Sequence, residues 1–224
     1  MRRHGFTLIE LLVVIAIVAV LAALIFPLIE PLLEKSRRTA CINHQRQLMT
    51  GVISYASDND GVLPYPNWGN NAGQQGWLYT PPNMTLPKHT EAGFIWPYVR
   101  TTKVYFCPQD LIASAKAADR PQKLSSYCMN GAVSFYSTTL TPARLAQFPG
   151  NAVCLWEQDD GANGYWFNDG SNYPQEGISK RHKDGAIVAC FDGHAEWMTW
   201  KQYNDECQPK PGRFFCNPNS STGQ

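Results

Sequence analysis

The chain has 224 residues, of which 44% are hydrophobic and 17% are charged. This composition fits one globular domain of ordinary size with an appendage, and it excludes a disordered or collagen-like chain. Nineteen Lys and Arg residues are balanced by eighteen Asp and Glu residues, and no basic run stands out. The electrostatic pattern of a nucleic-acid-binding protein is therefore missing, and no nucleic-acid partner is expected.

A long apolar segment opens the chain. Residues 6–26 contain only two polar side chains, Thr7 and Glu10. As a helix, such a segment spans roughly 30 Å, the thickness of the hydrocarbon core of a bilayer. A secretory signal would be shorter and would end in small residues rather than in Phe26 and Pro27. A plain transmembrane anchor would avoid a carboxylate at position 10, which costs on the order of 2.5 to 3.5 kcal/mol inside the membrane.

The start of this segment follows a more specific pattern. A short basic leader, residues 1–5, ends in Gly5; Phe6 follows, and Glu10 is the fifth residue counted from Phe6. This pattern resembles the leader and cleavage site of type IV pilins and type II secretion pseudopilins. The resemblance implies that a prepilin peptidase cuts between Gly5 and Phe6 and methylates the new N-terminus. Residues 6–29 would then remain as the transmembrane and filament-core helix.

The same resemblance implies an assembly role for Glu10. A buried carboxylate is tolerated where it meets a buried cation, and in these families the cation is the N-terminal amine, here of Phe6, in a neighbouring subunit. The basic leader stays in the cytoplasm by the positive-inside rule, which leaves the C-terminal part outside the bacterial inner membrane. A simpler interpretation is that Glu10 is a carboxylate favoured by the dipole at a helix N-terminus.

Helical periodicity continues beyond this apolar segment. Residues 30–60 carry one apolar stripe between polar positions, which predicts an amphipathic half-helix lying against a sheet. The stripe includes Cys41, Leu48, Val52 and Tyr55. Gly61 suits a left-handed cap, so one helix is predicted from about Phe6 to about Ser57, bent at its two prolines.

The remaining residues, 61–224, favour short strands separated by turns. Strands are predicted at 93–99, 104–107, 126–130, 132–136, 152–157, 164–167, 186–191 and 194–200. Helical turns are predicted at 115–119 and 142–148. Asp192 and Gly193 predict a two-residue hairpin turn between the last two strands. A long N-terminal helix packed on an antiparallel sheet is a pilin-like α+β fold.

The hairpin carries a second resemblance. His182 is followed by nine residues and then by Asp192 and Gly193. This spacing resembles a prepilin-associated C-terminal motif of pilin-like proteins from planctomycetes and their relatives, and residues 106–108 and 126–130 are similar to the middle region of those proteins. The resemblance implies no activity, so the motif has no assigned role.

Two interpretations of His182 remain open from the sequence. The favoured one is a cap of the hairpin, in which the imidazole bonds to the backbone or to Asp192. The other is a metal site with Asp184, Asp192 and His194, because imidazole and carboxylate groups suit zinc or a similar ion.

No cofactor is expected from the sequence. The alternative is calcium, which a loop rich in oxygen donors suggests. Some pseudopilins hold calcium in a loop of the globular domain, and the resemblance points to Asp159, Asp160 and Asp169. The spacing does not match an EF-hand, and solvated turns are the favoured interpretation.

Seven cysteines without a CxxC pair are typical of disulfides if the domain lies outside the cytoplasm. Cys207 and Cys216 resemble the C-terminal disulfide that many pilins carry. The next pairings by position are Cys107 with Cys128 and Cys154 with Cys190, which leaves Cys41 free and packed on the helix.

The family resemblance implies a structural subunit rather than an enzyme. The subunit would belong to a type IV pilus-like filament or a type II secretion pseudopilus, with the prepilin peptidase, other pilin subunits and the inner membrane as partners. The chain has no nucleophile elbow, phosphate loop, zinc signature or spaced carboxylate pair. The alternative is a membrane-anchored carbohydrate-binding or adhesive protein, which would require its many aromatic side chains to be exposed.

Overall fold

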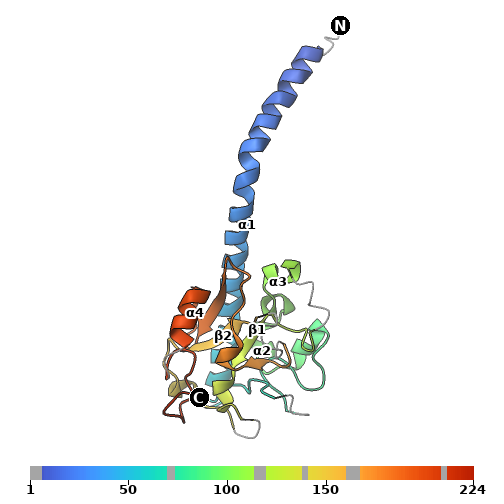
Figure 1. Ribbon diagram of the computed structural model, residues 1–224. Coiled ribbons are helices and arrows are strands. Elements are labelled where there is room, and N and C mark those ends of the chain that lie inside the picture. The colour runs from blue at the N-terminus through green and yellow to red at the C-terminus, as the bar shows by residue number, and fades with distance from the viewer. Residues whose placement is uncertain (1–6, 70–73, 114–119, 138–140, 160–166, 208–210) are drawn as a thin grey trace. The chain divides into compact units, whose positions relative to one another are not determined.

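The computed structural model describes residues 7–69, 74–113, 120–137, 141–159, 167–207 and 211–224. The chain forms two compact units, Met1–Arg37 and Arg38–Gln224. Helix α1, Leu8–Asp58, runs through both units without interruption. Figure 1 shows its second half beside the strands of the second unit. The divisions expected from the sequence at residues 5, 29 and 60 remain predictions.

The first half of α1 is apolar and exposed. Its large apolar side chains from Leu8 to Leu33 are between 40% and 79% exposed. An 18-residue window within the helix reaches a mean hydropathy of 3.2, and none of it is buried. Pro27 and Pro31 lie inside the helix. By length and composition, this half of α1 fits a single-pass membrane anchor.

The second half of α1 buries the predicted stripe. Cys41, Leu48 and Val52 are fully buried, and the side-chain amide of Gln45 donates to the carbonyl of Ile187 in the sheet at 2.8 Å. The helix ends at Asp58, close to the predicted end. The predicted left-handed cap is confirmed at Gly61, which has φ +80° and donates its N–H to the carbonyl of Ala56.

A five-stranded sheet lies in the second unit, in the order β3-β1-β2-β4-β5. The strands are β1 Tyr127–Asn130, β2 Val153–Glu157, β3 Ser171–Asn172, β4 Gly185–Cys190 and β5 Ala195–Thr199. The pairs β1–β2, β2–β4 and β4–β5 are antiparallel, whereas β3 pairs with β1 in parallel. The α+β class is confirmed, and the sheet is mixed only through its short edge strand β3.

Side chains of β1 and β4 alternate between two hydrophobic clusters. In β4, Ile187 belongs to the same cluster as Leu48 of α1. The next residue, Val188, belongs to the cluster that contains Tyr203 of helix α4, Trp200–Cys207. The sheet is therefore covered by α1 on one face and by α4 with the C-terminal segment on the other.

Half of the strand predictions are confirmed. The segments 126–130, 152–157, 186–191 and 194–200 contain β1, β2, β4 and β5. Three are wrong, and the structure has helical turns there: α2 Trp96–Val99, and the 3-10 helices Thr102–Tyr105 and Gly131–Ser134. Short apolar runs do not distinguish a strand from a buried helical turn. In α2, Pro97 removes a backbone donor and fixes φ.

The remaining elements are short. The sequence missed β3, α4 and α3, Pro108–Ala113. Further 3-10 helices lie at Pro87–Ala92, Leu145–Gln147 and Pro174–Glu176, and the second of these confirms the helical turn predicted at 142–148. The turn predicted at 115–119 and most of the strand predicted at 164–167 lie outside the described residues.

A fragment that begins at Pro31 should be soluble and folded without detergent. It lacks most of the exposed apolar half of α1 but keeps the complete unit Arg38–Gln224 with both clusters. Circular dichroism should show one cooperative thermal transition, and gel filtration should show no aggregate. Precipitation, or a gradual melt with no transition, would show that the second unit depends on the removed part of α1.

Candidate functional site

The processing residues Gly5 and Phe6 lie outside the described residues, whereas Glu10 lies in the first turn of α1. The Glu10 carboxylate accepts hydrogen bonds from the backbone N–H and the hydroxyl of Thr7, both at 2.8 Å. The Glu10 N–H donates to the Thr7 hydroxyl at 3.3 Å. Glu10 therefore caps its own helix, and its pairing with the amine of a neighbouring subunit stays a prediction.

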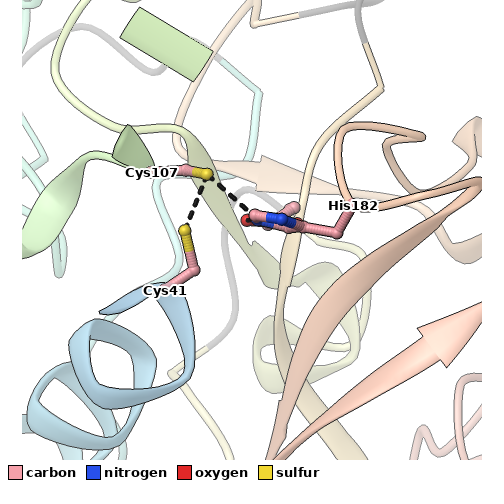
Figure 2. A group of neighbouring side chains, drawn as sticks. Cys41, Cys107 and His182 are labelled. Atoms are coloured by element: carbon pink, nitrogen blue, oxygen red, sulfur yellow. Dashed lines mark hydrogen bonds and ion pairs between the residues drawn. The ribbon is translucent and has the colours of Figure 1, made fainter. Parts of the chain in front are cut away.

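Four thiol, imidazole and carboxylate side chains from separate segments meet inside the second unit. Cys41 lies on α1, Cys107 precedes α3, Glu157 ends β2 and His182 lies in the loop before β4. All four are 0% exposed. One possible ligand atom from each residue lies within 4.8 Å of the others. Figure 2 shows Cys41, Cys107 and His182 pointing toward one another. We call these four residues the buried cluster.

Cys107 is central among the contacts of the buried cluster. Its Sγ lies 2.7 Å from Sγ of Cys41 and 3.3 Å from Nε2 of His182 (Figure 2). The same Nε2 lies 3.2 Å from Oε1 of Glu157. The four side chains therefore form a continuous series of polar contacts from α1 to the strand β2.

Neighbouring groups hold two members of the buried cluster in place. The second carboxylate oxygen of Glu157 accepts a hydrogen bond from the Ile187 N–H at 2.9 Å and one from the Ser179 hydroxyl at 3.4 Å. The carbonyl of His182 accepts a hydrogen bond from Nε1 of Trp197 at 2.8 Å. These contacts leave Oε1 of Glu157 directed at the imidazole.

Burial and mutual contacts change the protonation of the buried cluster. Burial raises the pKa of the Cys107 thiol, as does the adjacent Cys41. Burial disfavours the charged form of His182, but its hydrogen bonds to Cys107 and Glu157 raise its pKa to about 10. Burial also disfavours ionised Glu157, yet the hydrogen bond and charge of His182 hold the pKa of this carboxyl below its usual value. Without a bound ion, the buried cluster therefore contains an ion pair between the imidazolium of His182 and the carboxylate of Glu157, beside the neutral thiol of Cys107.

An ion-pair network adjoins Cys107. The buried Asp110 carboxylate accepts two hydrogen bonds from Arg120, at 2.7 and 2.8 Å, and lies 3.2 Å from Nε of Arg181. It also accepts the hydroxyl of Ser126, which in turn accepts the N–H of Cys107. Burial alone would raise the pKa of Asp110, but the hydrogen bond and charges of the two arginines lower it below its usual value.

His182 and Asp192 do not meet. They flank opposite ends of β4, and a six-residue strand is about 20 Å long. The expected contact of His182 with Asp192 is therefore not formed, and Nε2 of its imidazole contacts Cys107 and Glu157. The metal ligands expected beside His182 do not surround it. Asp192 and His194 lie at the hairpin turn, beyond the other end of β4.

The hairpin itself is confirmed, with its turn one residue earlier than expected. The Gly193 N–H donates to the carbonyl of Cys190 at 2.9 Å, which centres the turn on Phe191 and Asp192. Gly193 follows with φ +90°, a conformation that glycine adopts without strain. The Asp192 carboxylate accepts the backbone N–H of His194 at 3.0 Å and contacts its ring nitrogen at 2.6 Å.

The oxygen-rich loop is described only in part. Asp160 lies outside the described residues, and Asp159 is the last residue before that gap. Asp169 is buried, and its carboxylate accepts the backbone N–H groups of Gly69 and Ser171 at 2.7 and 2.9 Å. These bonds give Asp169 a structural role, and the calcium site stays a prediction.

The cysteines are arranged differently from the pairings by position. No disulfide joins any of the seven in the structure. Cys107 adjoins Cys41, while Cys128 belongs to the cluster on the opposite face of the sheet. The Cys207 thiol donates to the carbonyl of Pro174 at 3.7 Å, and the Cys216 sulfur accepts the side-chain amide of Asn130 at 3.5 Å. A Cys207–Cys216 disulfide stays a prediction.

Tryptophan side chains do not form an exposed surface in the described part of the chain. Trp77 and Trp156 are buried, and the other four described tryptophans are half-buried. They are Trp68, Trp96, Trp197 and Trp200. The carbohydrate-binding alternative requires exposed rings, so the described tryptophans do not support it.

Comparison with known proteins bears on the N-terminal segment. The family model described as the prokaryotic N-terminal methylation motif matches residues 1–26. The chain carries a prepilin methylation motif. The match includes Gly5, Phe6 and Glu10, and with the apolar helix it supports a pilin-like protein. Neither the search of curated proteins nor that of solved structures found a match to this chain.

Replacing Asp110 by Asn should destabilise the second unit by about 3 to 5 kcal/mol at pH 7, because two arginines would be left without their buried carboxylate. The pKa of Asp110 is lower in the folded protein than in the unfolded chain. The stability that its carboxylate contributes is therefore fully present above the pKa of the unfolded chain, and it is lost as the pH falls through the pKa of the folded protein. The difference in the free energy of unfolding between Asp110→Asn and the unaltered protein should therefore become smaller below about pH 4.

The matched control is Asp205→Asn, which removes an exposed partner of Lys201. It should change the free energy of unfolding by less than about 1 kcal/mol. Urea unfolding at pH 7 and at pH 3 measures both variants. Equal effects of the two substitutions at pH 7 would contradict a structural role for the Asp110 network.

Proposed function

We propose that this chain is a pilin or pseudopilin, a structural subunit of a type IV pilus-like filament or of a type II secretion pseudopilus. The observation that carries the proposal is the methylation motif over residues 1–26, which continues into an apolar and exposed helix. The motif implies a substrate of the prepilin peptidase. Pilin-like proteins are structural, so no catalytic activity is assigned.

The exposed half of α1 supports this function by its surface. Side chains from Leu8 to Leu33 have no cover in the described chain, and a surface of this kind requires lipid or other apolar helices. Before assembly the inner membrane supplies lipid. After assembly the helices of neighbouring subunits bury the same side chains, and the unit Arg38–Gln224 lies outside the membrane.

Glu10 supplies register in this proposal. Inside an apolar filament core, the carboxylate is stable when it meets a positive charge, and the N-terminal amine of Phe6 in the next subunit is that charge. The bonds from Thr7 occupy Oε2 of Glu10 in the single chain, so the second oxygen remains for the neighbouring subunit. A subunit displaced along the filament axis would leave both charges unpaired.

Processing is tested by Gly5→Val. The peptidase requires a small residue before Phe6, so this variant should keep its leader and remain in the membrane as unprocessed protein. Mass spectrometry of the unaltered protein should show an N-methylated Phe6. His4→Ala changes the adjacent position and should be processed normally. An intact leader on assembled protein would contradict the proposal.

Assembly is tested by comparing Glu10→Val with Thr7→Val. Both remove the side-chain bond between the two residues, but only the first removes the carboxylate. A stranded buried charge costs several kcal/mol, so incorporation of Glu10→Val into filaments should fall by about 100-fold, while Thr7→Val should assemble. Immunoblots of sheared filaments against membranes measure the fraction. Equal defects in the two variants would show that Glu10 acts only as a helix cap.

A further inference from the structure

We propose that the buried cluster of Cys41, Cys107, Glu157 and His182 is a closed binding site for one zinc ion. The ion would join α1 to the sheet and give the motif residue His182 its role. This inference goes beyond assembly of the filament, and it depends only on the unit Arg38–Gln224.

The donor set is the first argument. Two sulfurs, one imidazole nitrogen and one carboxylate oxygen are the ligand types that zinc binds in proteins, with four ligands in structural sites. Calcium and magnesium prefer oxygen donors and do not select thiols. All four side chains are fully buried, so the site has no position open to a substrate. A structural ion fits this arrangement, whereas a catalytic ion does not.

The geometry is the second argument. Ligand atoms around a tetrahedral ion, with bonds of about 2.0 to 2.3 Å, lie roughly 3.3 to 3.8 Å apart. The separations of Cys107 Sγ and Glu157 Oε1 from Nε2 of His182 are 3.3 and 3.2 Å. The two sulfurs, 2.7 Å apart, must separate by about 1 Å.

The surroundings are the third argument. Protein ligands of zinc are oriented by hydrogen bonds from the next layer of residues. Oε2 of Glu157 is already bonded to the Ile187 N–H and the Ser179 hydroxyl, so Oε1 is the ligand atom. The Cys107 N–H is bonded to Ser126, which fixes the backbone that carries the central thiol.

A disulfide between Cys41 and Cys107 is the competing occupant. It would account for two of the four residues, whereas one ion accounts for all four. A second group of possible ligands, Cys190, His194 and Glu196, differs from the buried cluster. There the guanidinium of Arg213 already donates to Glu196 and to the Cys190 sulfur.

The test uses the full chain purified in detergent. Protein kept under a phosphine reductant and exposed to Zn²⁺ should retain one zinc per chain after desalting. Co²⁺ in place of Zn²⁺ should give the intense visible absorption of a tetrahedral, thiolate-bound ion. Both measurements are made on the unaltered chain, so they do not depend on how well any variant folds.

Variants assign the ligands. Removing a residue that only orients a ligand weakens metal binding 10- to 100-fold. Removing a ligand itself should weaken it at least as much, so Cys41→Ser and His182→Gln should raise the Kd for Zn²⁺ by at least about 100-fold. Competition with a chromophoric chelator measures this change. Cys128→Ser makes the same substitution at another fully buried thiol outside the cluster and should leave the affinity unchanged.

Three results would overturn the proposal. The first is the absence of stoichiometric metal in the reduced chain exposed to Zn²⁺. The second is retention of zinc in both ligand variants. The third is a Cys41–Cys107 cross-linked peptide in protein isolated without reductant from its own membrane, since a disulfide removes both thiolates. None of these results bears on filament assembly, which is measured separately with Glu10→Val.

Discussion

One helix has to satisfy two environments, and the rest of the structure depends on this constraint. The first half of α1 exposes apolar side chains all round, as a membrane or a filament core requires, whereas the second half exposes only its polar side. The change occurs within one continuous helix, in which only Pro27 and Pro31 lack the N–H that an internal backbone bond requires. An interruption would leave unpaired backbone groups in the apolar environment, at a cost of several kcal/mol for each group.

The second half of α1 serves as one outer layer of the sheet domain. Its stripe shares a cluster with residues on one face of β1, β2 and β4, and the residues on the opposite face pack under α4 and the C-terminal segment. The strands are short and buried on both faces, which explains why apolar residues follow one another in β1, β2 and β4 and why the polar residues Asn130 and Glu157 stand only at strand ends. Loss of either layer would expose a complete face of the sheet.

Some polar contacts between α1 and the rest of the unit are fully buried. Gln45 bonds to the backbone of β4, and Cys41 adjoins Cys107 and through it His182. Buried polar groups require specific partners, so such contacts select one position of the helix along the sheet more strictly than apolar packing does. A zinc ion at the buried cluster would add to this selection, because its ligands come from four segments that are distant in sequence.

The amino-acid sequence by itself determined the elements that depend on local chemistry. The basic leader with Gly5, Phe6 and Glu10, the length of the apolar helix, its left-handed cap at Gly61 and the hairpin near Gly193 were all predictable, because each depends on neighbouring residues.

The sequence did not distinguish strands from helical turns at 93–99 and 132–136, where burial comes from the surrounding fold. It also paired Cys107 with Cys128 and His182 with the hairpin. Only the tertiary structure brought Cys107 to Cys41 and His182 to Glu157, since the separations along the chain, 66 and 25 residues, follow no local pattern. Contacts of this kind depend on how α1 crosses the sheet and on strand order, which no spacing of residues specifies.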